Sequence, residues 1–162
     1  VIAEHPSIIA SYLWNTFDFA VPMWGRGGVP ARNLKGLVTF DRKIKKDSYF
    51  WYKANWSKDP VLYLTQRRNT EREKKVTSVT IYSNIGTPKV YLNGQELNGI
   101  RKGYTDVHYV FDEVTLNNGK NTLTAIVRYK GKEYKDEIEW NYTGEKKREA
   151  DSYVNKSVHA GW

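Results

Sequence analysis

Four cations fall within five consecutive positions of the chain: Arg42, Lys43, Lys45 and Lys46. Such a cluster can bind a phosphate or another anion. It can also be the solvated first turn of a surface helix, which is the simpler interpretation. Residues 1–58 hold nine Lys and Arg against four Asp and Glu, whereas residues 59–143 hold thirteen against eleven. Because the second part is nearly charge-balanced, we expect no nucleic-acid partner.

The aromatic side chains are a second set that could bind a ligand. The chain has six Trp, twelve Tyr and five Phe, and such side chains bury large areas or stack on sugar rings and bases. The absence of Cys excludes disulfides, thiol nucleophiles and thiolate metal sites. We expect no metal and no cofactor. No apolar run approaches the roughly 20 residues of a membrane span, so we expect no membrane partner.

The pattern over the first 58 residues predicts one strand, one long loop and one helix. Ile8–Trp14 is nearly all apolar, as in a strand buried on both faces of a parallel sheet. The loop over 19–36 is rich in Gly and Pro, and long structured loops often carry function. Asp41 is a plausible N-cap for a helix that ends before Asp59-Pro60. One strand and one helix cannot close a core, so this segment is predicted to be part of a larger domain.

From Val61 onward the pattern changes to short β-rich runs separated by turn residues. The runs are Val61–Leu64, Val76–Tyr82, Val90–Leu92, Val107–Phe111, Thr122–Tyr129 and Glu133–Trp140. Asn93-Gly94 and Lys130-Gly131 signal tight hairpins, and Asn117-Asn118-Gly119 signals a third turn. Together they predict an immunoglobulin-like β-sandwich over residues 59–143. Residues 144–162 are polar without a clear period, as in a linker or tail.

Four stretches of the first segment carry a family resemblance. They are Trp14–Ala20, Asn33–Lys43, Lys45–Asp47 and Tyr52–Trp56, in order and with natural spacing. Together they resemble the end of the catalytic (β/α)8 barrel of glycoside hydrolase family 2, the family of β-galactosidases, β-glucuronidases and β-mannosidases. Residues 59–143 look like the all-β domain that follows this barrel in many members. The resemblance implies a mainly β fold class: an immunoglobulin-like sandwich preceded by a β-loop-α fragment of the barrel.

The resemblance also implies three substrate-binding residues. Trp14 would end the eighth barrel strand, on the face where barrel enzymes place their active sites, and would form part of the sugar pocket wall. The alternative is a core Trp that caps the barrel. Asn33 and Lys35 match an Asn-x-Lys signature that contacts the uronate carboxylate in β-glucuronidases, although a similar string occurs in β-galactosidase-like members. The alternative is a loop lysine that pairs with a nearby carboxylate. Asp18 could line the pocket, but a structural hydrogen-bonding role is simpler.

The two catalytic carboxylates are expected to lie outside this chain. Retaining glycosidases need an acid/base and a nucleophile about 5–5.5 Å apart. The resemblance places them on the fourth and seventh barrel strands, upstream of Val1. Glu4 would lie at the opposite, N-terminal end of the eighth strand, which bears on stability rather than catalysis. We therefore expect no catalytic residue in this chain and no hydrolysis by the chain alone.

The leading hypothesis is part of a retaining exo-glycosidase that acts on terminal β-galactosides, with a β-linked oligosaccharide or glycoside as substrate. One alternative is a β-glucuronidase of the same family. Another is a non-catalytic carbohydrate-binding or spacer module, with a sugar platform formed by Tyr104, Tyr109, Tyr129 or Tyr134. The sequence does not determine the cellular compartment; we favour a periplasmic or extracellular location, in a bacterium, for the longer protein. In isolation, residues 1–58 must be covered by the sandwich or by a second copy of the chain, or else they aggregate.

Overall fold

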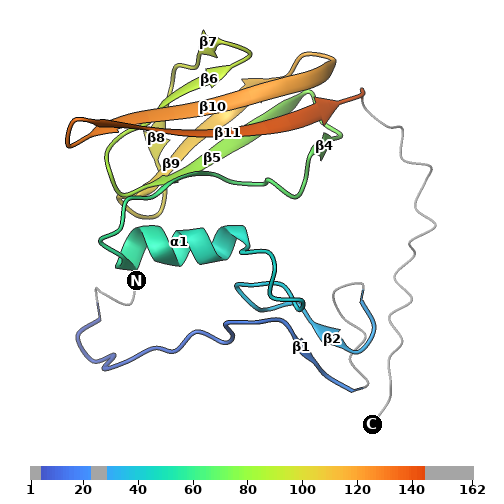
Figure 1. Cartoon of the computed structure of the whole chain (residues 1–162), viewed down its shortest axis with the longest axis vertical. Helices are drawn as coiled ribbons and strands as arrows, with labels where there is room; N and C mark the ends of the chain where they lie inside the picture. Colours follow the sequence, from blue (N-terminus) through green and yellow to red (C-terminus); the bar gives the residue numbers. More distant parts are fainter. Residues whose placement is uncertain (1–4, 23–28, 145–162) are drawn as a thin grey trace.

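The computed structural model of the chain describes residues 5–22 and 29–144, and a two-sheet sandwich dominates it (Figure 1). The first sheet runs in the order β4 (Glu71–Arg72), β11 (Lys132–Tyr142), β10 (Gly119–Tyr129), β6 (Lys89–Leu92) and β7 (Gln95–Glu96). The second sheet runs in the order β3 (Leu62–Leu64), β5 (Val76–Ser83), β9 (His108–Thr115) and β8 (Arg101–Lys102). Apart from the parallel pair of β4 and β11, neighbouring strands are antiparallel. The predicted immunoglobulin-like β-sandwich is confirmed.

Both sheets contribute side chains to one core. Alternate positions of β10 face inward, so that Leu123, Ala125 and Val127 are buried between more accessible neighbours. Ile81 on β5 and Trp140 on β11 belong to the same cluster. Fully burying a side chain of this size contributes roughly 1.5–3 kcal/mol, so this alternation is the main source of stability.

The two predicted hairpins form with the expected turn chemistry. Asn93 and Gly94 have φ of 51° and 83°, and Lys130 and Gly131 have φ of 49° and 76°. Both residues of each loop are therefore left-handed, which matches the twist of the strands they connect. The Asn93-Gly94 turn joins β6 to β7, and the Lys130-Gly131 turn joins β10 to β11.

The third predicted turn carries the chain from one sheet to the other. It connects β9 with β10, and the fully buried Asn121 side chain holds it. Asn121 Oδ1 accepts from the Asn117 amide at 2.8 Å, and Asn121 Nδ2 donates to the carbonyls of Asn117 and Gly119 at 2.8 and 2.9 Å. The buried amide is thus fully used, as a buried polar group must be.

Helix α1 (Asp47–Trp56) packs on the second sheet of the sandwich. Phe50 stacks on Tyr63 with ring centroids 3.8 Å apart, and Trp51 meets Tyr82 edge to face at 5.2 Å. In Figure 1 the helix lies between the sandwich and the small ribbon of β1 (Phe19–Ala20) and β2 (Arg32–Asn33). Of the ways predicted to cover the first segment, coverage of its helix by the sandwich is the one the structure shows.

The predicted strand over Ile8–Trp14 is wrong for this chain. A turn closes from the Ile8 amide to the His5 carbonyl, and residues 8–13 then have no regular secondary structure. The side chains of Ile9 and Tyr12 are 98 % and 93 % exposed. A strand needs the backbone of a neighbour for its hydrogen bonds, and no described strand lies beside this segment.

The predicted helix start is also wrong. The helix begins at Asp47, and its N-cap Lys46 makes no side-chain capping bond. Asp41 instead closes a tight turn: its Oδ1 accepts from Thr39 Oγ1 at 2.6 Å and from the Lys43 amide at 3.1 Å. Arg42 in this turn has a left-handed φ of 65°. The basic cluster therefore precedes the helix and does not form its first turn.

The predicted tail falls outside the described residues except for Gly144. Within residues 5–22 and 29–144, no helix has the length and apolar character needed to cross a membrane. The same residues contain no group of three or more His, Asp or Glu side chains that could hold a metal ion.

Candidate functional site

A short backbone ladder brings the two halves of the first segment together. The amides of Leu37 and Val38 donate to the carbonyls of Asn15 and Thr16 at 3.1 and 3.0 Å, and the Asp18 amide donates to the Val38 carbonyl at 3.0 Å. The β1–β2 pair continues this contact, with Phe19 opposite Asn33. The ladder and the ribbon therefore place the residues after Trp14 beside the Asn33–Lys35 stretch.

Asp18 is the buried anchor of this region. Its side chain is almost fully buried, and Oδ1 accepts from Lys46 Nζ at 2.6 Å and from the Gly36 amide at 2.9 Å. Lys46 Nζ also donates to the Leu34 carbonyl at 2.9 Å. A Cβ at Gly36 would lie 2.1 Å from the backbone nitrogen of Asp18, so only glycine fits there. The structural role predicted for Asp18 is confirmed.

Sequence reasoning missed the two partners of Asp18 from the basic cluster. Lys46 forms the ion pair, and Arg42 donates from Nη1 to the Asp18 carbonyl at 3.0 Å while its guanidinium lies 4.1 Å from the Phe17 ring centroid. The sequence did contain a signal for such a partner: Asp18 lies in a largely apolar stretch, and a carboxylate that is buried needs a cation. Four candidate cations followed it in the sequence, and spacing alone could not choose among them.

Trp14 lies at the exposed end of this region. Its side chain is 72 % exposed, and its ring contacts Phe19 edge to face with centroids 6.1 Å apart. The peptide bond between Trp14 and Asn15 is cis. In this chain Trp14 is not packed in a core, so the indole presents an open surface of the kind on which a sugar ring can stack.

Asn33 and Lys35 differ sharply in their surroundings. Asn33 is buried, and its Oδ1 accepts from the Lys35 amide at 3.0 Å, which fixes the turn of the backbone between them. Lys35 is exposed and forms no ion pair with any carboxylate of the described residues. The loop lysine that does pair with a carboxylate is Lys46. Lys35 therefore presents a cation at the surface beside a rigid turn.

The three carboxylates of the first segment that the structure describes accept structural hydrogen bonds. Asp18 is bound by Lys46 and Gly36, and Asp41 by Thr39 and Lys43. Asp47 accepts from Tyr63 Oη at 2.8 Å and from the Gln66 amide at 2.7 Å. Burial, followed by this contact with Asp47, raises the pKa of Tyr63. The described residues of this segment can thus bind a ligand but offer no pair of available carboxylates for acid/base and nucleophilic work.

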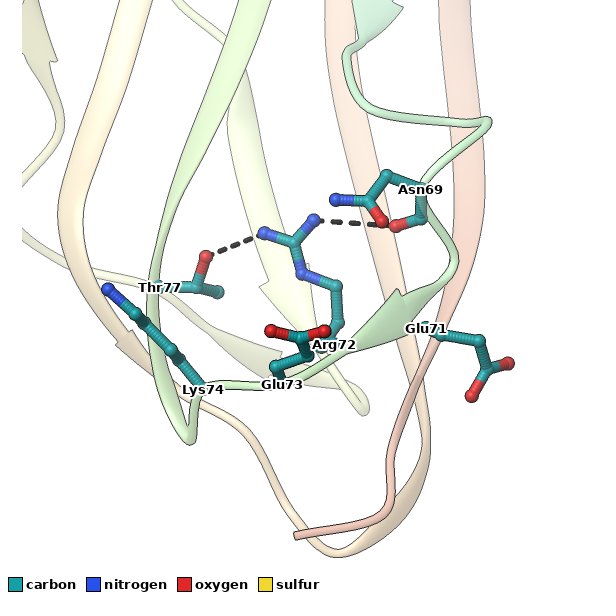
Figure 2. A pocket seen from close by; sticks show the side chains of 6 residues that line it. All are labelled: Asn69, Glu71, Arg72, Glu73, Lys74 and Thr77. Carbon is teal, nitrogen blue, oxygen red and sulfur yellow. Dashed lines mark hydrogen bonds between the residues drawn. The ribbon is translucent and has the colours of Figure 1, made fainter. Parts of the chain in front are cut away.

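A polar hollow at the other end of the sandwich is structural. Figure 2 shows the Arg72 side chain between Asn69 and Thr77. Arg72 Nη2 donates to Thr77 Oγ1 at 2.6 Å, Nη1 donates to Gln66 Oε1 at 2.5 Å, and the guanidinium lies 4.1 Å from the Trp140 ring centroid. Burial lowers the pKa of Arg72. This arginine ties β4 to β5 and to the core, which leaves no role for it in the Trp14 region.

The tyrosine platform considered for the sandwich does not form as a group. Tyr109 is buried in the core, so its inclusion was wrong. The Tyr129 and Tyr134 rings are intermediate in exposure and lie near the ammonium groups of Lys130 and Lys132. Tyr104 is 91 % exposed, and it is a single ring rather than a platform.

Comparison with known proteins confirms the resemblance of this chain to the C-terminal part of family 2 glycosidases. The chain is homologous to enzymes of the β-glucuronidase and β-galactosidase type. No protein-family model matches the chain.

Among individual proteins, the chain is 34 % identical over 143 residues to a β-glucuronidase of Bacteroides fragilis, covering 88 % of the chain and 20 % of that protein. A crystal structure of a putative β-galactosidase from Bacteroides fragilis matches with 79 % identity and a TM-score of 0.88, over 93 % of this chain and 22 % of that one. An FMN-binding β-glucuronidase of Faecalibacterium prausnitzii matches with 40 % identity and a TM-score of 0.72, over 89 % of this chain and 21 % of that one. The chain thus spans about a fifth of the length of these relatives.

Proposed function

We propose that this chain is the C-terminal part of a retaining exo-glycosidase. In this proposal residues 1–58 are the end of the catalytic barrel, and residues 59–143 are the following sandwich domain. Residues 8–14, which form no strand in the chain alone, would pair as the last barrel strand only beside the rest of the barrel. The observation that carries it is the similarity over more than four fifths of the chain to enzymes named for β-glucuronidase and β-galactosidase activity. We call the longer protein the parent enzyme.

The parent enzyme would use double displacement through a glycosyl-enzyme intermediate. Its acid/base and nucleophile would lie in the part of the barrel outside this chain. The contribution of this chain would be recognition: Trp14 as a stacking surface, with Asn33 and Lys35 beside it. The buried Asp18–Lys46 pair would hold that loop in one geometry, because a misplacement of the sugar ring by about 1 Å can lower the rate about 100-fold.

The exposed cation at Lys35 supports a sugar acid as the terminal residue of the substrate. An ammonium and an adjacent backbone turn suit a carboxylate, since hydrogen bonds between charged partners are about twice as strong as neutral ones. The β-glucuronidase names of two relatives agree with this choice. A neutral β-galactoside is the second candidate, because the relative with 79 % identity is described as a putative β-galactosidase.

The substitution Lys35→Gln in the parent enzyme tests this choice. We expect kcat/KM on p-nitrophenyl β-glucuronide to fall about 10- to 100-fold, which corresponds to the loss of one charge-assisted hydrogen bond. Activity on p-nitrophenyl β-galactoside should change little. Lys58→Gln, an exposed lysine of the same segment, is the matched control.

The results of this test distinguish the two candidate substrates from each other and from a failure of the glycosidase proposal. Turnover of the galactoside alone, with no effect of Lys35→Gln, would overturn the glucuronide assignment and favour the second candidate. A parent enzyme that hydrolyses no β-glycoside in a panel of sugars would overturn the glycosidase proposal.

A further inference from the structure

A basic groove of about 650 Å³ lies where the turn over residues 42–45 approaches the sandwich. Four of the residues that line it are cations: Arg42, Lys43, Lys45 and Arg67. Asp136 on β11 is the one acidic residue in its lining. The groove joins the first segment to the sandwich, and it is separate from Trp14 and Lys35, neither of which lines it.

The floor of this basic groove is apolar and rigid. Phe50 from α1 and Tyr63 from β3 lie in parallel contact, 11° from coplanar, with centroids 3.8 Å apart. Leu62 and Ile44 border this pair. Tyr63 is itself buried against Phe50, so the surface open to a ligand consists of the partly exposed Phe50 and Leu62 and the exposed Ile44. Tyr63 supports this surface from below and does not offer a face of its own.

The single carboxylate does not neutralise the basic groove. Asp136 is bonded to Arg67 and accepts from the Leu64 amide at 2.7 Å, so its charge is already used. The Arg67 guanidinium also lies over the Tyr63 ring at 4.6 Å, which holds it against the floor. Three lining cations of the 42–45 turn, Arg42, Lys43 and Lys45, form no ion pair with a carboxylate of the described residues.

The backbone of the 42–45 turn has a defined position, while the side chains of Lys43 and Lys45 extend from it as exposed cations. The Lys45 ammonium lies 4.8 Å from the Tyr49 ring centroid. Arg42 is bonded to the Asp18 carbonyl and stacks on Phe17, and the backbone of Lys45 bridges to Val38. The Ile44 amide donates to Thr39 Oγ1 at 3.1 Å. Three cations thus leave one short, anchored stretch of backbone beside an apolar surface, which concentrates positive charge at this place.

We infer that the basic groove binds an acidic carbohydrate chain, one that carries carboxylate or sulfate groups. The C–H faces of its sugar rings would cover the accessible parts of Phe50, Leu62 and Ile44, and its anionic groups would contact the 42–45 cations. The choice of a carbohydrate over an acidic peptide rests on the proposed function. Binding in the groove needs no catalytic residue, so it is tested directly on the chain.

The test is a titration of the purified chain with oligosaccharides of matched length, followed by amide chemical shifts. A heparin-derived hexasaccharide and a galacturonic acid hexamer supply the sulfate and carboxylate arms, and cellohexaose is the neutral control. We expect saturable shifts around the basic groove with one or both acidic probes and none with cellohexaose. Affinity should fall as sodium chloride is raised, because exposed charges are screened by salt.

The double substitution Lys43→Gln and Lys45→Gln should weaken binding about tenfold while the fold stays intact, because both side chains are exposed. Its matched control is the double substitution Lys75→Gln and Lys120→Gln, which removes the same charge near the opposite end of β5. Hexaglutamate and a single-stranded oligonucleotide of similar charge are the competing probes.

The inference fails if neither acidic oligosaccharide binds, if cellohexaose binds equally, or if the groove variant and its control behave alike. Tighter binding of hexaglutamate or of the oligonucleotide would also overturn it in favour of another class of partner. Saturable binding of an acidic sugar together with an inactive parent enzyme would support the groove as a binding site and contradict the proposed function. An active parent enzyme without such binding would support the proposed function and contradict the groove as a binding site.

Discussion

The sandwich buries most of its large apolar side chains, whereas the first segment of this chain leaves several of its own exposed. In the sandwich, Leu123 and Trp140 are buried between the two sheets. In the first segment, Ile9, Tyr12 and Trp14 are exposed, and order comes from backbone contacts and the Asp18–Lys46 pair. The helix α1 belongs to both, because one side of it packs on β5.

The two regions therefore differ in what covers their apolar side chains. In the sandwich, the alternation of apolar and polar residues along the strands places each inward side chain against the opposite sheet of the same chain. The first segment specifies a loop geometry and a set of apolar side chains that no described residue covers. Exposed apolar surface of this extent on a chain otherwise well packed is typical of a contact with another surface.

A matched pair of tryptophan substitutions gives the largest predicted difference between the regions. Trp140→Ala should lower the free energy of unfolding of the sandwich by about 3–5 kcal/mol, because it removes a buried ring and the support of the Arg72 guanidinium. Trp14→Ala should change it by less than about 0.5 kcal/mol. Urea unfolding followed by circular dichroism measures both. Equal losses in the two variants would show that the first segment is part of the sandwich core.

The substitution Asp18→Asn should act only on the first segment. It removes the ion pair with Lys46 while the Asn oxygen can still accept from Gly36, so we expect a local loss of about 1–3 kcal/mol. Amide hydrogen exchange should accelerate about tenfold or more at Gly36 and Val38, with no change at Leu123. Unchanged exchange at Gly36 would mean that the pair does not hold the loop.

A smaller effect is expected from His108 when the pH is lowered. Burial, and then the charge of Arg101, lowers the pKa of His108 below its usual 6.5, and its Nδ1 accepts from the Tyr104 amide at 3.0 Å. The unfolded chain therefore takes up this proton first, so the contribution to stability is present above pH 6.5 and is lost as the pH falls through the folded pKa. His108→Asn keeps an acceptor and should remove this part of the pH dependence. Parallel thermal midpoints of the two proteins between pH 7.5 and 5.5 would contradict the prediction.

The sandwich could be predicted from the sequence because its signals are local. The alternation in β10 and the left-handed Asn93-Gly94 and Lys130-Gly131 loops each depend on a few neighbouring residues. Their agreement along the chain was enough to fix the fold class. The same local reasoning identified the turn before β10, although not that buried Asn121 holds it together.

The first segment resisted prediction because its structure depends on distant partners. The apolar run over Ile8–Trp14 suits a strand, but it has no described strand to pair with. Asp41 has the right chemistry for a helix cap and accepts from the Lys43 amide as a cap would. The left-handed Arg42 that follows it closes a turn instead of a helix, and the helix starts at Asp47. The roles of Trp14, Asn33 and Lys35 in substrate binding stay predictions, since the sugar-binding partners of such a pocket come from the whole barrel.

We propose that this chain contributes residues that bind the substrate but not the catalytic carboxylates, and one assay tests this directly. The purified chain is incubated with p-nitrophenyl β-glucuronide and p-nitrophenyl β-galactoside, and release of p-nitrophenol is compared with buffer. We expect no turnover above the buffer rate with either substrate. Saturable turnover that copurifies with the chain and is lost on unfolding would contradict it, because the acid/base and the nucleophile would then have to lie among these 162 residues.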